Sequence, residues 1–227
     1  MKLTQIEAKT LPEAWFLCIA LLMTKHPLST TGASLPGIHQ YVVDRGSFEK
    51  THQRLEFDHV TIHIECPGSK PLVPDVPQGV PAPTTQEYID GYLPYLMEDQ
   101  IAPNEDYTYG MDLKKQIPAV IKMYKEDGYN TNQAYMAVGS TDSILLKDPQ
   151  CLRGVDTRIQ YGKLHFIVYF RSWDLWGGFP ANLGAIQIMK EYMASEIGVE
   201  DGEIIANSKG LHLYDHCWDL AKSVLRR

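Results

Sequence analysis

The spacing of hydrophobic positions along the chain predicts a small number of strands and several long helices. Residues 163–170 form an apolar run rich in aromatic and β-branched side chains, which indicates a buried strand. Residues 60–64 alternate between apolar and polar positions and predict a second strand. Residues 182–197 repeat their apolar positions at helical spacing, with one face made of Leu183, Ile186, Met189 and Met193.

Local signals predict further elements on either side of these. Leu11-Pro12-Glu13 starts a helix that contains the apolar run 14–23 and ends near His26-Pro27. Thr85 is suited to cap the N-terminus of another helix, and residues 113–124 form a third helix with Pro118 in its first turn. The remaining predictions are strands at 39–43, 134–139 and 203–206, and a segment 212–225 that begins as strand or loop and ends as helix.

Prolines are too dense between residues 67 and 83 for regular structure. This segment is an irregular loop, or a linker between an N-terminal portion and the rest. A chain of 227 residues suits one large domain or two small ones, and we expect a single domain over residues 1–227. The order of elements favours the α+β class, a mixed β-sheet packed with several long helices.

Charge and hydropathy exclude some kinds of partner. A net charge of −7 disfavours a general DNA or RNA surface, which needs a basic stripe, although a few arginines are enough to hold one small anion. The apolar run 14–23 is shorter than the roughly 20 residues of a membrane-spanning helix. It also lacks the basic leader of a signal peptide, so we expect a cytoplasmic protein that does not bind membranes.

The cysteines point to chemistry at one position. Cys18, Cys66, Cys151 and Cys217 are far apart and form no CxxC pair, so we expect no metal site and no disulfide framework. Most such cysteines are ordinary buried thiols. Cys151 is different because it stands a short loop ahead of the strand 163–170, with Arg153 and Arg171 available to stabilise a thiolate.

Four short motifs follow one another at and after Cys151. They are Pro149-Gln150-Cys151, Arg171-Ser172-x-Asp174, Gly178-Phe179-Pro180-Ala181-Asn182 and His212-Leu213-Tyr214. In their order and intervals, these motifs resemble those of the thymidylate synthases, the short archaeal branch in particular. The resemblance covers about the last third of the chain.

The resemblance implies a fold, a reaction and an assembly. The fold is thymidylate synthase-like, and the assembly is a homodimer joined through its sheets. Cys151 attacks C6 of deoxyuridine monophosphate (dUMP), and C5 then takes a one-carbon unit and a hydride to give dTMP. The implied donor is 5,10-methylenetetrahydrofolate or a related methylene-tetrahydropterin, for example of the tetrahydromethanopterin type.

The resemblance also implies how the nucleotide is bound. Arg171 and Ser172 bind the 5′-phosphate, while Asp174 contacts the base through its main-chain N–H. Asn182 bonds the O4/N3 edge, with Gly178 close to the ring. His212 and Tyr214 hold the 3′-hydroxyl. Each position also has a purely structural interpretation, as a strand end, a turn residue, a helix cap or a core residue with a satisfied polar tip.

The chain departs from the family pattern at several places. Leu152 stands in place of the family's histidine, and Thr131-Asn132 stands where a partner subunit lends an arginine pair for the phosphate. Arg153, Arg45 and Arg54 are candidate replacements. The family's long C-terminal tail is expected to be absent.

The residues that would bind the carbon donor are harder to identify in the sequence than those for the nucleotide. The family's proton-relaying glutamate corresponds to Glu87 or Glu98, in that order of preference. The pair Tyr109-Gly110 resembles a turn near the cofactor.

Two other functions remain open at this point. One is a hydroxymethylase acting on dCMP or dUMP, although Asn182 disfavours a cytosine nucleotide. The other is a nucleotide- or RNA-binding protein with reduced or no turnover.

Overall fold

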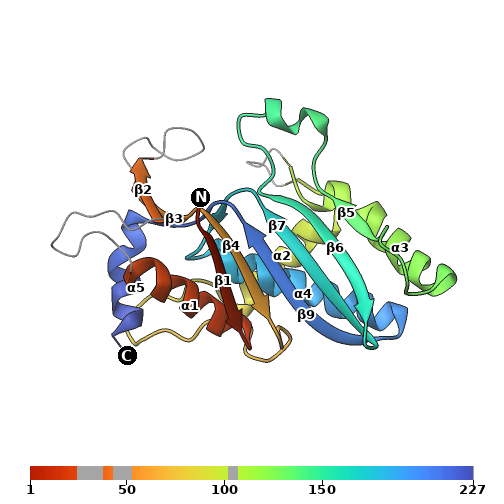
Figure 1. Cartoon of the computed structure of the whole chain (residues 1–227), viewed down its shortest axis with the longest axis horizontal. Coiled ribbons are helices and arrows are strands. Elements are labelled where there is room, and N and C mark those ends of the chain that lie inside the picture. The colour runs from red at the N-terminus through yellow and green to blue at the C-terminus, as the bar shows by residue number, and fades with distance from the viewer. Residues whose placement is uncertain (25–37, 43–52, 102–106, 227) are drawn as a thin grey trace.

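The computed structural model describes residues 1–24, 38–42, 53–101 and 107–226 (Figure 1). Its described strands form two mixed sheets. The larger has six strands in the order β1-β4-β9-β7-β6-β5, and the smaller has four in the order β2-β3-β10-β8. The larger sheet contains β1 (Leu3–Ala8), β4 (His59–Ile64), β5 (Tyr135–Ala137), β6 (Leu152–Gln160), β7 (Lys163–Phe170) and β9 (Glu200–Ser208). The smaller contains β2 (Ile38–Val42), β3 (Gln53–Phe57), β8 (Trp173–Asp174) and β10 (Leu211–Tyr214).

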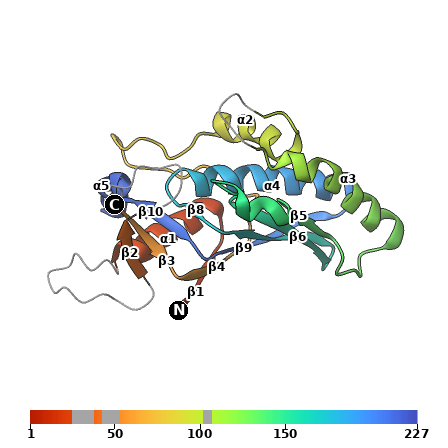
Figure 2. The same cartoon turned by 90° about the horizontal axis from the view of Figure 1, so that it is seen from above.

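Helices cover one face of the larger sheet. Figure 2 shows α2, α3 and α4 on the same side of it, with α4 next to the strands. α1 packs against α4, α5 and strands of both sheets. The helices are α1 (Leu11–Thr24), α2 (Gln86–Met97), α3 (Gly110–Asp127), α4 (Gly178–Ile197) and α5 (Trp218–Leu225), with short 3-10 turns at Thr141–Leu145 and Asp215–Cys217. This is the predicted α+β class.

α4 is the central helix of the core. All four residues of its predicted apolar face are buried, and so are Gln187 and Lys190 beside that face and Ala181 on another. The helix is therefore enclosed by α1, α2, α3 and the sheet, as its contacts show. It begins at Gly178, four residues before the predicted start at 182, because Pro180 is tolerated in a first turn.

Several other predicted elements are confirmed. β7 covers 163–170, β4 covers 60–64, and β9 contains 203–206. The apolar run 14–23 lies in α1, whose predicted end near His26-Pro27 falls outside the described residues. Thr85 caps α2, since its hydroxyl accepts a hydrogen bond from the Tyr88 N–H at 3.1 Å.

The proline-dense segment 67–83 contains no helix or strand, as predicted. It is nevertheless packed against the rest of the protein, because Leu72 is fully buried in the core. No helix among the described residues is both long and apolar enough to cross a membrane.

Two expectations about elements were wrong, and some strands were missed. The interval between Cys151 and β7 is not a short loop but the strand β6, which pairs antiparallel with β7. β1 and β3 were not predicted. Pro118 lies well inside α3 and not in its first turn, because the helix already begins at Gly110. Pro118 is exposed, so the carbonyl that loses its N–H partner faces water.

Candidate active site

Cys151 lies where the loop 148–150 enters β6. Its carbonyl accepts a hydrogen bond from the Arg171 N–H at 2.9 Å, and the next residue, Leu152, pairs with Phe170 across the sheet. The antiparallel pairing of β6 and β7 therefore brings the thiol beside the arginine. The sequence predicted this pair, and the strand between the two residues explains how they meet.

The Arg171 side chain is turned toward the loop that carries Cys151. Its Nε donates to the carbonyls of Pro149 and Gln150, both at 3.1 Å, and a terminal nitrogen donates to the Asp148 carboxylate at 2.9 Å. The side chain keeps 28% of its surface exposed. Arg171 thus holds the nucleophile loop in place and still offers part of its guanidinium to a ligand.

The charge environment of the thiol is balanced between opposing effects. Burial raises the pKa of Cys151 above its ordinary value, the Arg171 guanidinium lowers it, and the Asp148 carboxylate raises it. A hydrogen bond with the Tyr107 side chain lowers the same pKa. The resting thiol is therefore protonated near neutral pH, and Arg171 and Tyr107 are the groups that favour the thiolate.

Four tyrosines from three segments lie within electrostatic range of this thiol. Tyr92 of α2, Tyr107, Tyr109 and Tyr214 of β10 all lie close enough for a Cys151 thiolate to raise their pKa values, after burial as the main cause. The Tyr109 hydroxyl also accepts a hydrogen bond from the Leu152 N–H at 3.3 Å. Cys151 is thus close to the start of α3 and within electrostatic range of α2 and β10.

Asn182 lies in the first turns of α4 and lines a neighbouring cavity of about 290 Å³. Gly177 and Gly178 line the same cavity from the start of the helix, and Tyr88 and Tyr92 line it from α2. The Asn182 Oδ1 accepts a hydrogen bond from the Trp173 indole at 2.9 Å. The predicted neighbours Gly178 and Asn182 are therefore brought together, and Tyr92 lines their cavity while lying within electrostatic range of Cys151.

Asp174 has two separate roles in the local geometry. Its carboxylate accepts the N–H groups of Trp176 at 3.2 Å and of Gly177 and Gly178 at 2.9 Å, which caps the start of α4. The N–H groups of its neighbours in the chain, Trp173 and Leu175, donate to the carbonyls of Gly210, just before β10, and of His212 in β10. Because N–H directions alternate along a strand, the Asp174 N–H points to the opposite side of β8, the open edge of that sheet.

His212 is a buried, neutral histidine with one unsatisfied nitrogen. Its Nδ1 lies 2.8 Å from the Gly210 carbonyl, to which it donates, and its Nε2 is buried without a partner. Burial, followed by the nearby Arg54 charge, lowers the pKa of His212 to about 4. The Nε2 lone pair is therefore an acceptor that needs a donor such as a hydroxyl.

Tyr214 lies on the same face of β10, with its ring 4.7 Å from that of His212. Arg54 of β3 stands opposite Tyr214, bonds to its hydroxyl, and forms an ion pair with Glu56 at 2.9 Å. Of the three candidate replacement arginines, Arg54 thus joins His212 and Tyr214. Arg153 lies in β6 beside Gly139, and Arg45 is outside the described residues.

Ser172 is half-buried in the turn between β7 and β8. It directly follows Arg171, and Gly210 approaches its backbone from the start of β10. The predicted phosphate pair thus lies at the end of β7, next to the strand that carries His212 and Tyr214.

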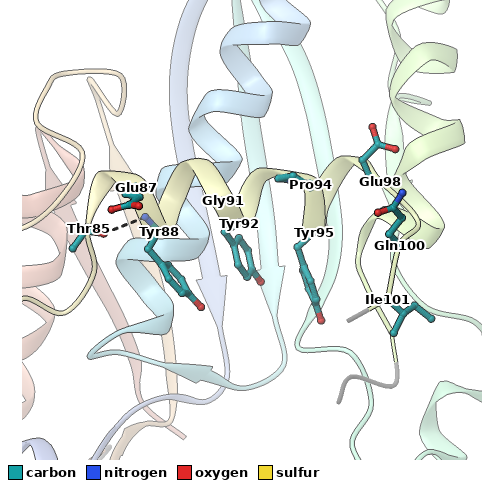
Figure 3. Close-up of a pocket in the computed structure, with 10 residues that line it drawn as sticks. All are labelled: Thr85, Glu87, Tyr88, Gly91, Tyr92, Pro94, Tyr95, Glu98, Gln100 and Ile101. Carbon is teal, nitrogen blue, oxygen red and sulfur yellow. Dashed lines mark hydrogen bonds between the residues drawn. The ribbon is translucent and has the colours of Figure 1, made fainter. Parts of the chain in front are cut away.

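A tyrosine row on α2 lines a groove of about 990 Å³. Tyr88 and Tyr92 stack with ring centroids 6.2 Å apart, and Tyr92 and Tyr95 stack at 5.0 Å. Figure 3 shows the three hydroxyls pointing to one side of the helix. The carboxylates of Glu87 and Glu98, the two candidate proton-relaying acids, lie on the other side of the helix, and Glu98 pairs with Lys114 at 3.3 Å.

Sequence reasoning missed the aromatic part of the site. A signal for part of it was present in the sequence. The predicted helix after Thr85 carries Tyr88, Tyr92 and Tyr95 at helical spacing, which predicts an aromatic row along one face. Tyr107 and Trp173 gave no such signal, because each matters only through a contact made in the folded protein.

The fold and this arrangement define a class of protein: an α+β protein with a half-buried thiol beside an arginine, and a nearby cavity of about 290 Å³ lined by an asparagine and two tyrosines. The same fold occurs in thermostable thymidylate synthase A from Bacillus subtilis, with a TM-score of 0.70 and 17% identity, over 95% of this chain and 84% of that one. The family model of thymidylate synthase matches residues 105–227. The chain belongs to the thymidylate synthase family.

Relatives of similar length are found in archaea. A protein of Methanosarcina acetivorans, provisionally named a thymidylate synthase, is 26% identical over 97% of this chain and 94% of its own length. A protein of the same provisional name from Methanosarcina barkeri is 27% identical over the same shares. Thymidylate synthases are methyltransferases of dTMP biosynthesis that bind dUMP and a methylene-tetrahydrofolate-type carbon donor.

Proposed function

We propose that this protein is a thymidylate synthase that converts dUMP to dTMP through a covalent bond between Cys151 and C6 of the base. One observation carries the proposal. The pairing of β6 with β7 holds Cys151 beside Arg171, and the thiol is within electrostatic range of Tyr92, which lines the Asn182 cavity, and of Tyr214, which contacts His212.

The residues of the chain account for binding and for activation of the base. Arg171 and Ser172 bind the 5′-phosphate, and the Nε2 of His212 accepts the 3′-hydroxyl proton with Tyr214 beside it. The Cys151 thiolate attacks C6, and the electron pair of the C5–C6 bond moves toward O4. The amide nitrogen of Asn182 donates a hydrogen bond to the negative charge that develops there.

The tyrosine row of α2 is the surface we propose for the carbon donor. A pterin is flat and aromatic, and stacked tyrosines along an open groove suit such a ring. The methylene-tetrahydropterin supplies both the one-carbon unit and the hydride, and leaves as the dihydropterin. Methylenetetrahydrofolate and a methanopterin-type donor both meet this requirement.

The proposal is tested by following a labelled one-carbon unit. The protein is incubated with dUMP or dCMP and a methylene donor labelled at the methylene carbon. We expect label in dTMP only, and no label with Cys151→Ala. Label that appears only on the cytosine nucleotide contradicts the proposal and supports a hydroxymethylase.

A second candidate is a nucleotide-binding protein without turnover. The observation in its favour is the raised pKa of Cys151, together with the engagement of Arg171 by Asp148 and the loop carbonyls. This candidate predicts that dUMP binds, that no label is transferred with either donor type, and that Cys151→Ala binds dUMP as well as the natural protein does.

A further inference from the structure

The amide of Asn182 is held in one orientation by a neighbour outside the predicted set of site residues. Its Oδ1 lies 2.9 Å from the indole Nε1 of Trp173. An indole N–H is a donor only, so it must face the oxygen of the amide and not its NH₂ group. The Trp173 indole thus determines which atom of the Asn182 amide is the oxygen and which is the nitrogen, an assignment that the shape of the amide alone leaves ambiguous.

Trp173 itself has little freedom to move. Its ring stacks on Phe170 with centroids 4.0 Å apart and 6° between planes, and it lies 4.6 Å from Phe179. Trp173 is 2% exposed, while Phe170 and Phe179 are fully buried. A rotation of the indole that would release Asn182 therefore requires the core around it to rearrange.

We propose that Trp173 is the residue that makes the site selective for uracil over cytosine, because it forces Asn182 to present its NH₂ group to the base. This inference rests on the proposed function and adds a specificity-determining residue to it. Uracil O4 is an acceptor and is satisfied by the NH₂ group. The second lone pair of Oδ1 remains for the N3–H of uracil.

A cytosine nucleotide needs the opposite arrangement. Its exocyclic amino group is a donor, so the amide oxygen would have to face it. The reversed amide would then point its NH₂ group at the indole N–H, and two donors would meet in a buried place. Selectivity thus comes from a penalty against the wrong base as well as a bond to the right one.

The test is calorimetric titration of the full chain with dUMP and with dCMP, and the quantity of interest is the ratio of the two affinities. In Trp173→Phe the amide is released, and we expect the preference for dUMP to fall by about tenfold or more. Because Phe is smaller than Trp, 3-benzothienylalanine at position 173 is the second variant. It keeps the shape of the indole and removes only the N–H, and it should lower the preference in the same way.

Two comparisons separate this effect from a general disturbance of the pocket. In an Asn182→Asp background either orientation of the side chain presents an oxygen, so Trp173→Phe should leave the ratio unchanged. Trp218→Phe removes an indole whose N–H bonds to the Leu213 carbonyl at 3.1 Å, and it should also leave the ratio unchanged.

The outcomes are distinct. An unchanged ratio in both position-173 variants overturns the role of Trp173, and so does a change that is equally large with Asn182 intact and in the Asn182→Asp background. Failure of the natural protein to bind dUMP would instead count against the proposed function.

Discussion

At the scale of single residues, the reactivity of Cys151 depends on two charged neighbours that act in opposite directions. Burial sets a raised pKa, the guanidinium of Arg171 lowers it, and the carboxylate of Asp148 raises it. The same two neighbours bond to each other at 2.9 Å. Removing the charge of either Asp148 or Arg171 should therefore change the pKa of the Cys151 thiol.

Paired substitutions test this arrangement. Asp148→Asn removes the negative charge and should move the ionisation of Cys151 to lower pH, whereas Arg171→Gln removes the positive charge and should move it to higher pH. The measurement is the rate of iodoacetamide alkylation against pH, followed on the Cys151 peptide by mass spectrometry so that the exposed Cys66 does not interfere. Shifts in the same direction, or none, would contradict the assignment.

Residue types and intervals in the sequence were enough to predict some of the polar residues that the fold brings together. Cys151 and Arg171 meet because their strands pair, and His212 and Tyr214 share a face because strand positions alternate. The Trp173–Asn182 bond could not be predicted this way. It depends on how α4 packs over β8, which no local pattern specifies.

At the scale of elements, the start of α4 depends on an acid that lies outside the helix. Gly177, the residue just before α4, has no side chain to cap it, and Asp174 supplies the missing acceptors from β8. The same contacts join the strand that carries Trp173 to the helix that carries Asn182. Helix stability and site geometry are therefore coupled at this point.

Asp174→Ala should lower the free energy of unfolding by about 1–2 kcal/mol, the usual effect of losing a helix cap. It should also weaken dUMP binding, because the first turn of α4 loses its anchor. Urea unfolding and a binding titration provide the two readings. Asp219→Ala removes an acid from the first turn of α5 whose ion pair with Lys222 is exposed, and it should change neither quantity appreciably. Equal effects from both variants would refute the capping role.

Strand β6 shows why some elements escaped prediction. Its pairing with β7 is irregular between Leu152 and Gly154, so the alternation of buried positions shifts within the strand. Gly154 looks like a turn signal in the sequence. In the fold it is required because the Tyr135 side chain crosses it, and a Cβ there would lie 1.9 Å from the Tyr135 hydroxyl.

At the scale of the whole molecule, the helices α2, α3 and α4 occupy one side of the six-stranded sheet (Figure 2). On the opposite face, His63 bonds to Glu7 at 2.6 Å and to Glu203 at 3.1 Å, which joins β1, β4 and β9. Ile167 and the partly exposed Tyr169 alternate with buried residues of β7. We propose this face as the surface on which a second copy of the chain packs, in keeping with the homodimer that the family resemblance implies.

Light scattering tests the assembly directly. We expect a mass twice the 25.7 kDa of the chain, and a single-chain mass for Ile167→Asp, because an additional carboxylate without a positively charged partner is costly to bury in the contact. Leu145→Asp, at a site that is 80% exposed in the 3-10 turn, should leave the dimer intact. A single-chain mass for the natural protein would contradict the proposal.

The central claim is that Cys151 forms a covalent bond with the nucleotide, and 5-fluoro-dUMP with a methylene donor tests it most directly. Fluorine at C5 blocks the loss of a proton there, so a reaction that has begun stops at the covalent stage. Intact mass and peptide mapping should show the natural protein carrying the nucleotide on Cys151, and Cys151→Ala carrying none. A natural protein that binds the nucleotide but forms no adduct with either a folate or a methanopterin-type donor would contradict the account.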